Sequence, residues 1–208
     1  MDDWTYGQKA NTPSITVKSG ESDITDSYAS GFTCTYYTDG SCTDMTTAAD
    51  GAATNGGVPK NAGTYYVKAV VPENGNYAGA EAEASFTIAP LPADLTWSKT
   101  DLIYTGSEQS VSATVANALE GDSFAIAYEG NTQTEAGDSY TATVTDLGND
   151  NYTLTGATGV SRNWSISYLQ TSAAAQVSGT KGNNDWYISP VKLVPDSGYQ
   201  ISTDKTDW

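Results

Sequence analysis

No group of residues in this chain has the composition of a catalytic centre. The 208 residues include no histidine and only two cysteines, Cys34 and Cys42. Ser-His-Asp, Cys-His and His-based zinc sites are therefore excluded, and two thiolates cannot form a four-cysteine site. The acidic residues that lie close together, such as Glu81 and Glu83, fit a solvated strand face better than a pair of catalytic carboxylates. We predict that the protein is not an enzyme and has no cofactor or metal site.

Aromatic side chains are the best candidates for a binding site. Tyr37 and Tyr66 alternate away from the residues predicted to form the core, and Trp186 and Tyr187 follow two asparagines in a predicted loop. Exposed rings beside amides can stack on sugars or anchor a protein partner. For Trp186 and Tyr187 we prefer a structural interpretation, in which an incomplete third module leaves core aromatics bare.

The two cysteines flank a predicted Asp39-Gly40 turn. A two-residue loop at this turn would place Tyr37, and not Cys34, opposite Cys42. Direct pairing of the cysteines requires a longer loop centred on Thr38. Such a disulfide would be expected in an exported protein, because thiols that lie close together become oxidised outside the cell. Two interpretations stay open, a local disulfide between Cys34 and Cys42 or two small half-buried side chains.

The composition narrows the class of protein further. Nine basic residues stand against 25 acidic ones, so the net charge is −16, which predicts no binding to nucleic acid or to an anionic membrane face. No segment is apolar over the length that a membrane crossing needs, and the N-terminus lacks the pattern of a signal peptide. We expect a fragment of an exported protein, extracellular or at the cell surface, with signal and anchor outside this chain.

A motif that occurs twice organises the chain. Ala62-Gly63-Thr64-Tyr65 and Ala136-Gly137-Asp138-Ser139-Tyr140 each lead into an alternating apolar pattern, and each is followed by an Asn-Tyr pair, Asn76-Tyr77 or Asn151-Tyr152. Repetition of this kind is typical of small modules in series. Short alternating runs separated by Gly, Asn, Asp and Pro predict strands and turns, and hence an all-β sandwich.

We predict three modules: residues 1–90, residues 91–169 and a partial module over residues 170–208. The two prolines of Ala89-Pro90-Leu91-Pro92-Ala93 predict an extended, stiff link between the first two. Thr43 to Val58 is a long inserted loop that the second module lacks. In the second module, alternation predicts a core made of Val111, Ala113, Val115, Phe124, Ile126, Tyr128, Tyr140, Ala142 and Val144.

These motifs resemble the YGX-type Ig-like repeats of large bacterial surface proteins. The resemblance rests on Trp4-x-Tyr6-Gly7, on Pro59 to Ala69, on Asn76-Tyr77 and on Phe86-Thr87-Ile88, with related residues in the second module. It covers roughly Trp4 to Leu169, and it implies tandem Ig-like β-sandwich modules, the last one incomplete.

Ig-type sandwiches also suggest roles for the repeated residues. A tyrosine near the start of strand F closes the preceding corner through its hydroxyl, and Tyr65 and Tyr140 match that tyrosine. The glycine before each tyrosine fits a corner that needs a positive φ or a close approach. The inward position two residues after the tyrosine, often a cysteine, is Val67 or Ala142 here, so apolar packing replaces the disulfide between the sheets.

Two functions remain as expectations. The leading one is a non-catalytic spacer or stalk in an exported bacterial cell-surface protein, which projects distal domains. The alternative is an adhesin module whose loops bind a host glycan or protein, for instance a mucin or an immunoglobulin. Loop length discriminates between them, because an adhesin often carries its specificity in a long loop, and Thr43 to Val58 is the candidate.

Overall fold

The protein is built almost entirely of β-strands. The computed structural model describes residues 1–28, 31–75, 77–168, 175–184, 186–190 and 192–195. The chain forms two compact units, Met1–Ile166 and Ser167–Trp208. The helical elements among the described residues are two 3₁₀ turns, η1 (Thr25–Tyr28) and η2 (Ala48–Asp50). The expected all-β class is confirmed.

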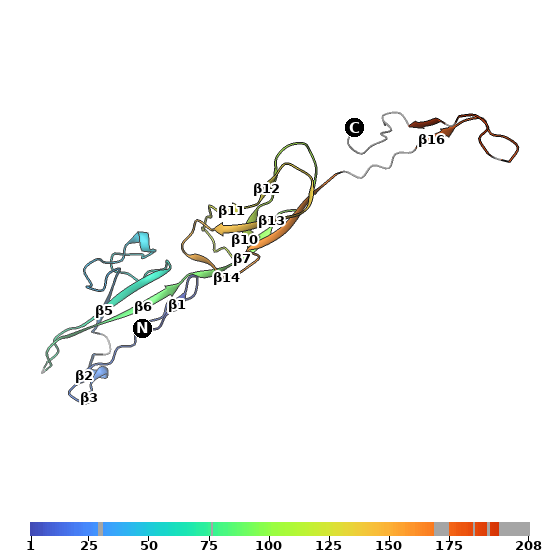
Figure 1. Cartoon of the computed structure of the whole chain (residues 1–208). Helices are drawn as coiled ribbons and strands as arrows, with labels where there is room; N and C mark the ends of the chain where they lie inside the picture. The colour runs from blue at the N-terminus through green and yellow to red at the C-terminus, as the bar shows by residue number, and fades with distance from the viewer. Residues whose placement is uncertain (29–30, 76, 169–174, 185, 191, 196–208) are drawn as a thin grey trace. The chain divides into compact units, whose positions relative to one another are not determined.

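The first module contains a four-stranded sheet (Figure 1). The long central pair is antiparallel, and the short first strand adds to the edge of the sheet in parallel. In spatial order the strands are β1 (Trp4–Thr5), β6 (Ala80–Ala89), β5 (Gly63–Val71) and β4 (Thr33–Tyr37). A small hairpin of β2 (Lys18–Ser19) and β3 (Ser22–Asp23) precedes η1.

The second module repeats this sheet with the same order of equivalent strands. They are β8 (Asp101–Ile103), β15 (Ser161–Ser167), β13 (Gly137–Asp146) and β11 (Ala127–Glu129). The register also repeats, because Gly63 and Gly137 lie opposite Ile88 and Ile166 respectively. The extra residue before Tyr140 is absorbed by a β-bulge between Gly137 and Tyr140. The sequence motif thus corresponds to one sheet topology used twice.

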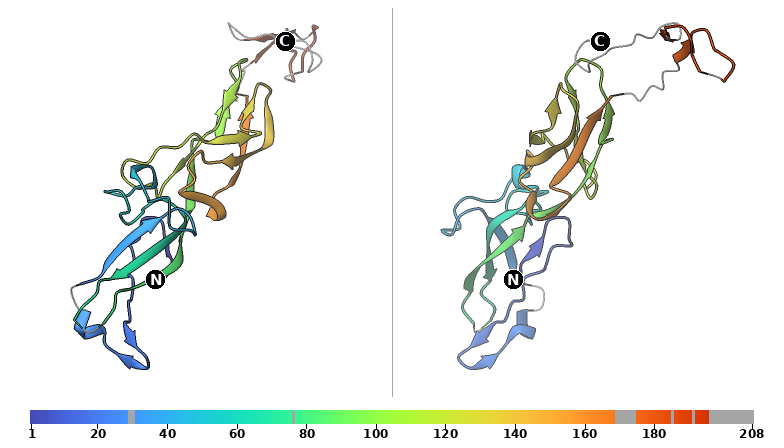
Figure 2. Two further views of the ribbon diagram at one scale, coloured as in Figure 1. Left: turned by 90° about the vertical axis from the view of Figure 1, so that its left-hand side faces the viewer. Right: turned by 45° about the vertical axis from the view of Figure 1, so that its right-hand side comes forward.

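A second sheet completes the sandwich of the second module. Its strands, in spatial order, are β10 (Ala113–Val115), β7 (Leu91–Trp97) and β14 (Tyr152–Thr158). A further pair joins β9 (Gln109–Ser110) to β12 (Thr132–Gln133). Pro90 alone separates β6 from β7, so the last strand of the first module continues directly into the second module (Figures 1 and 2). The extended link that the two prolines predict is therefore present, and Pro92 itself lies inside β7.

Each module has its own buried core. In the first, Trp4 stacks on Phe86 with ring centroids 5.0 Å apart, and Tyr65 lies 5.8 Å from the same ring. In the second, Val111, Ala113, Ala142 and Val144 are buried as predicted. The other predicted core residues, Val115, Phe124, Ile126, Tyr128 and Tyr140, are partly buried and pack against those clusters.

The tyrosine corner predicted for both modules is present. The Tyr65 hydroxyl donates to the Asn61 carbonyl (3.1 Å), and the Tyr140 hydroxyl donates to the Glu135 carbonyl (3.0 Å). A Cβ at Gly137 would lie 2.6 Å from the Tyr140 hydroxyl oxygen, so glycine is required for close approach of the ring. The inward positions Val67 and Ala142 are 4% and 0% exposed, as expected for residues on the core face of each sheet.

The inserted segment Thr43–Val58 is folded rather than loose. Thr46 is fully buried, and its Oγ1 donates to the Gly57 carbonyl at 2.6 Å. The backbone of Tyr36 in β4 donates to Gly56 and accepts from Thr46, so the insertion covers the free edge of the sheet. η2 begins with a capping box formed by Thr47.

The two cysteines lie on opposite faces of the first sheet. Cys34 packs against the core, whereas the Cys42 thiol hydrogen-bonds Glu83 on the solvent face and has its pKa raised, first by burial and then by that carboxylate. Neither thiol is in a disulfide. The Asp39 carboxylate accepts from the backbone of Thr43 and Asp44, and this longer loop replaces the two-residue turn. A local disulfide would have to cross the sheet, so the structure favours the half-buried interpretation.

The second unit contains a hairpin of β16 (Ala175–Ser178) and β17 (Lys192–Pro195). An isolated bridge between Lys181 and Tyr187 lies within the connection. Residues 196–208 of the predicted third module lie outside the described residues.

Candidate functional site

The two modules of the first unit meet at Tyr6, which directly follows β1. Its hydroxyl donates to the Asp122 carboxylate, with oxygen–oxygen distances of 2.9 and 3.1 Å. The Tyr152 hydroxyl donates to the same carboxylate at 2.7 Å, and the two tyrosine rings pack edge to face with centroids 5.6 Å apart. Burial, reinforced by the Asp122 hydrogen bond, raises the pKa of Tyr6 to about 12. Both hydroxyls therefore stay protonated as donors at neutral pH.

Backbone hydrogen bonds support this contact on both sides. The Tyr6 N–H donates to the Ala89 carbonyl (2.8 Å), and the Leu91 N–H donates to the Asn151 carbonyl (2.9 Å). The Asn151 side-chain oxygen accepts from the Ala62 N–H at 2.7 Å. Tyr6 also packs against the cores of both modules. We call Tyr6, Asp122, Asn151 and Tyr152 the junction cluster.

The junction cluster gives Tyr152 a role different from that of Tyr77, its counterpart in the first module. Tyr152 is 5% exposed, whereas Tyr77 is 38% exposed. One repeated tyrosine thus joins two modules while the other lies at a surface.

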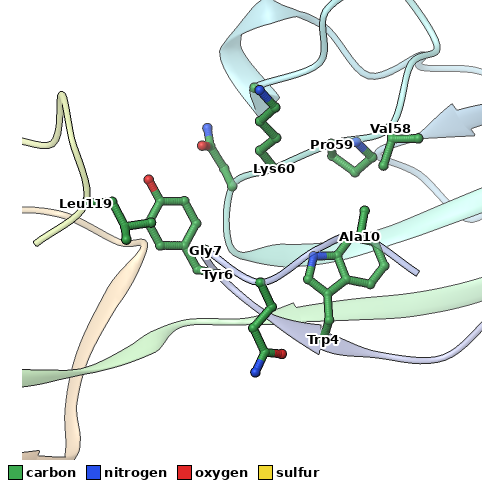
Figure 3. Close-up of a pocket in the computed structure, with 11 residues that line it drawn as sticks. Trp4, Tyr6, Gly7, Ala10, Val58, Pro59, Lys60 and Leu119 are labelled. Atoms are coloured by element: carbon green, nitrogen blue, oxygen red, sulfur yellow. The ribbon is translucent and has the colours of Figure 1, made fainter. Parts of the chain in front are cut away.

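A pocket lies beside the junction cluster (Figure 3). Its volume is about 440 Å³, within the range of small-molecule sites. Three parts of the chain meet there: the start of the first module, the end of the insertion and a loop of the second module. The lining residues are Trp4, Tyr6, Gly7, Gln8, Ala10, Gly51, Val58, Pro59, Lys60, Asn61 and Leu119.

The walls of this junction pocket are mainly apolar. In Figure 3, Trp4, Ala10, Val58 and Pro59 lie on the right, Tyr6 and Leu119 lie on the left, and Lys60 lies at the top beside Pro59. No ion pair to Lys60 is present among the described residues. A groove of this kind can hold an apolar ring or side chain that carries a hydrogen-bonding group.

Comparisons with known proteins give no indication of function, so function must be inferred from the geometry. No family model, curated protein or solved structure matches this chain. Within the described part of the chain, no three acidic or cysteine side chains are grouped so that they could hold a metal ion. Over the same residues, no helix has the length and apolar character to span a membrane.

Tyr37 and Tyr66 do not form an exposed aromatic site. They are cross-strand neighbours on the solvent face of the sheet, but Tyr37 is only 8% exposed and Tyr66 is half-buried. A Cβ at Gly40 would lie 3.3 Å from the Tyr66 ring, so the loop after β4 passes over it. The alternation of residues along β4 and β5 correctly predicted the face on which the two tyrosines lie. It could not predict that a loop covers this face.

Trp186 and Tyr187 differ from each other in exposure. Trp186 is 78% exposed, while Tyr187 is half-buried with the Lys181 ammonium 5.7 Å from its ring centroid. Both belong to the second unit, and of the two Trp186 has the more exposed ring.

Sequence reasoning did not assign Trp4, Tyr6, Gln8 or Leu119 to a site. Tyr6-Gly7 could be recognised in the sequence, because it belongs to the repeated motif. That motif, however, predicted a structural role and no binding site. Leu119 gave no signal, since it reaches the pocket through a contact between modules: a Cβ at Gly7 would lie 2.7 Å from Leu119 Cδ1.

Proposed function

We propose that this protein is a non-catalytic structural region of an exported bacterial surface protein, in which tandem Ig-like modules act as a stalk. The observation that carries the proposal is the fixed junction between the first two modules. Connected domains normally move relative to each other unless their interface restrains them. Here the linker is one residue long, and the junction cluster bonds to both modules.

Several further features support a stalk at a cell surface. The same sheet topology is used twice, as in repeat proteins whose length depends on the number of modules. The net charge of −16 keeps such a chain soluble and discourages self-association. The resemblance to YGX-type surface repeats points to the same role.

Replacing Asp122 with alanine tests this proposal. The substitution removes the acceptor of both the Tyr6 and Tyr152 hydroxyls, so we expect stability to fall by about 1–3 kcal/mol and the modules to reorient independently. Residual dipolar couplings measured on the whole chain will then fit one alignment tensor for both modules in the native protein and two tensors in the variant.

The matched control is Asp94→Ala. Asp94 accepts a hydrogen bond from Thr158, so its loss removes a comparable contact inside the second module alone. We expect one shared tensor in this variant. Two different tensors in the native protein would overturn the rigid stalk.

The junction pocket favours binding as a second candidate function. Gly51 and Val58, which line it, belong to the insertion that the second module lacks. An adhesin module would use this pocket to hold part of a host glycan or protein. The proposal therefore places any adhesive activity at the end of the insertion rather than at Tyr37 or Tyr66.

A glycan array and a pull-down from serum test this second function. Val58→Arg should abolish any binding by filling the pocket mouth, because Val58 is 37% exposed and can carry the longer side chain without unfolding. Val70→Arg is the control, since Val70 is equally exposed (40%) but lies outside the pocket. Equal binding by both variants, or no binding by the native chain, would rule the pocket out.

A further inference from the structure

The only arginine of the chain, Arg162, lies in a row of side chains that otherwise packs the core. In β15, Arg162, Trp164 and Ile166 alternate on one face, and the latter two are 2% and 0% exposed. Arg162 continues that row to the edge of the sandwich, where it is exposed. The equivalent position in the first module is Ala84, two residues before Phe86. The arginine is thus a difference between the modules and not part of their common scaffold.

The Arg162 side chain makes no ion pair within the part of the chain that the structure describes. The chain contains 25 Asp and Glu residues, yet no side-chain hydrogen bond of Arg162 is present among the described residues either. Asp101 lines one of the hollows beside Arg162, and its carboxylate accepts a hydrogen bond from Ser165 (3.4 Å), whereas Lys99 lines neither hollow. A guanidinium that makes no ion pair keeps its forked set of donors available for an external carboxylate.

Two hollows adjoin at Arg162, which lines both together with Ser161. One, of about 300 Å³, is also lined by residues 95–98 and Gly159. The other, of about 510 Å³, is also lined by Thr100, Asp101 and Asn163. The two shared residues directly follow the turn from β14 to β15, and the two hollows are treated as one groove. We call it the Arg162 groove.

The aromatic wall of the Arg162 groove is rigid. The Trp97 indole N–H donates to the Gly159 carbonyl at 2.7 Å, and the ring packs against Tyr128 with centroids 5.9 Å apart. Gly159 has a φ of +69°, and a Cβ there would overlap the carbonyl oxygen of Leu95. Because residue 159 is glycine, its carbonyl can lie within hydrogen-bond distance of the indole. Trp97 is half-buried, and part of its surface lines the groove. Such a wall needs little ordering when a ligand binds.

We propose that the Arg162 groove binds a sugar acid, that is, a sugar ring that carries a carboxylate. The guanidinium of Arg162 would hold the carboxylate through paired N–H···O bonds, and the Trp97 indole would pack against the apolar face of the ring. Thr96, Ser98 and Ser161 also line this groove, and their hydroxyls, which bond Thr114, the Ser112 N–H and Thr143, can each both donate to and accept from a sugar hydroxyl. This activity goes beyond a stalk, and it does not depend on the junction cluster or the junction pocket.

An NMR titration of the whole fragment tests the proposal. The ligands are the methyl glycosides of glucuronic acid and of N-acetylneuraminic acid, with neutral methyl glucoside for comparison, and the Trp97 indole N–H signal is followed. We expect saturable shifts with at least one of the acids and affinity for the neutral sugar at least about tenfold weaker. The two acids distinguish a uronic acid from a sialic acid as the preferred ligand. Equal affinity for acid and neutral sugars, or no saturable shift with either acid, would overturn the proposal.

Substitutions at Arg162 separate recognition from general charge attraction. Arg162→Gln should weaken binding of the acid at least about tenfold, and Arg162→Lys should recover only part of it, because lysine keeps the charge but lacks the fork. Lys99→Gln is the matched control, since it removes a neighbouring exposed cation and should leave affinity almost unchanged. If Lys99→Gln and Arg162→Gln reduced the affinity for the acid by the same factor, the proposed forked contact would be wrong. If an oligoglutamate peptide bound as tightly as the sugar acids, the groove would recognise carboxylates without the sugar ring, which would also contradict the proposal.

Discussion

Replacing Trp164 with alanine is expected to lower the free energy of unfolding of the first unit by about 3–5 kcal/mol. Trp164 is 2% exposed, packs against Tyr140 with ring centroids 5.2 Å apart, and donates its indole N–H to the Gly130 carbonyl at 3.1 Å. Alanine leaves a cavity and removes this hydrogen bond. The measurement is urea unfolding of the native and variant proteins, followed by tyrosine and tryptophan fluorescence.

The equivalent substitution in the first module is Phe86→Ala, which makes the experiment a test of coupling. Phe86 is also 2% exposed and stacks on Trp4. Because the junction cluster joins the modules, we expect each substitution to shift one common transition. Two separate transitions, each sensitive to only one variant, would contradict cooperative folding of the unit. A loss below about 1 kcal/mol in Trp164→Ala would contradict its place in the core.

Replacing Gly159 with alanine is expected to destabilise the second module by more than the usual cost of a left-handed residue, which is about 1–2 kcal/mol. Gly159 has a φ of +69°, and the added Cβ would overlap the Leu95 carbonyl oxygen. Relief of that overlap must move the turn between β14 and β15, and with it the carbonyl that holds the Trp97 indole. Urea unfolding reports the loss, and the Trp97 indole N–H signal reports the displacement.

Gly106→Ala is the matched control for this prediction. Gly106 has a φ of +77°, but no atom lies within 4 Å of a Cβ placed there. The loss of stability in the control therefore reflects the backbone strain alone. The additional loss in Gly159→Ala measures the cost of the overlap between the added Cβ and the Leu95 carbonyl. Equal losses in the two variants would contradict that close approach.

The alternation of apolar residues was enough to predict the all-β class and part of the core of the second module. Val111, Ala113, Ala142 and Val144 are buried because side chains at every second position of a strand share a face. The tyrosine corners at Tyr65 and Tyr140 followed from local spacing, since each hydroxyl bonds a carbonyl only four or five residues before it.

Contacts between distant segments could not be predicted in this way. Tyr37 was expected at the surface, but the loop after β4 and the insertion bury it. Cys34 and Cys42 are near in sequence but lie on opposite faces, because the loop between them folds over the sheet. In both cases the position of a loop decided the outcome, and loops have no periodicity from which their path can be read.

The apolar alternation by itself determined the fold class, and the repeated Gly and Tyr residues determined the register shared by the two modules, because these features depend on neighbours along one strand or corner. Only the tertiary structure decided which residues meet at the junction and in the Arg162 groove. Tyr6 and Asp122 are 116 positions apart, and Trp97 and Gly159 are 62 apart. No local pattern encodes such pairs, because they form only when separate strands, each stable for its own reasons, pack into one sandwich.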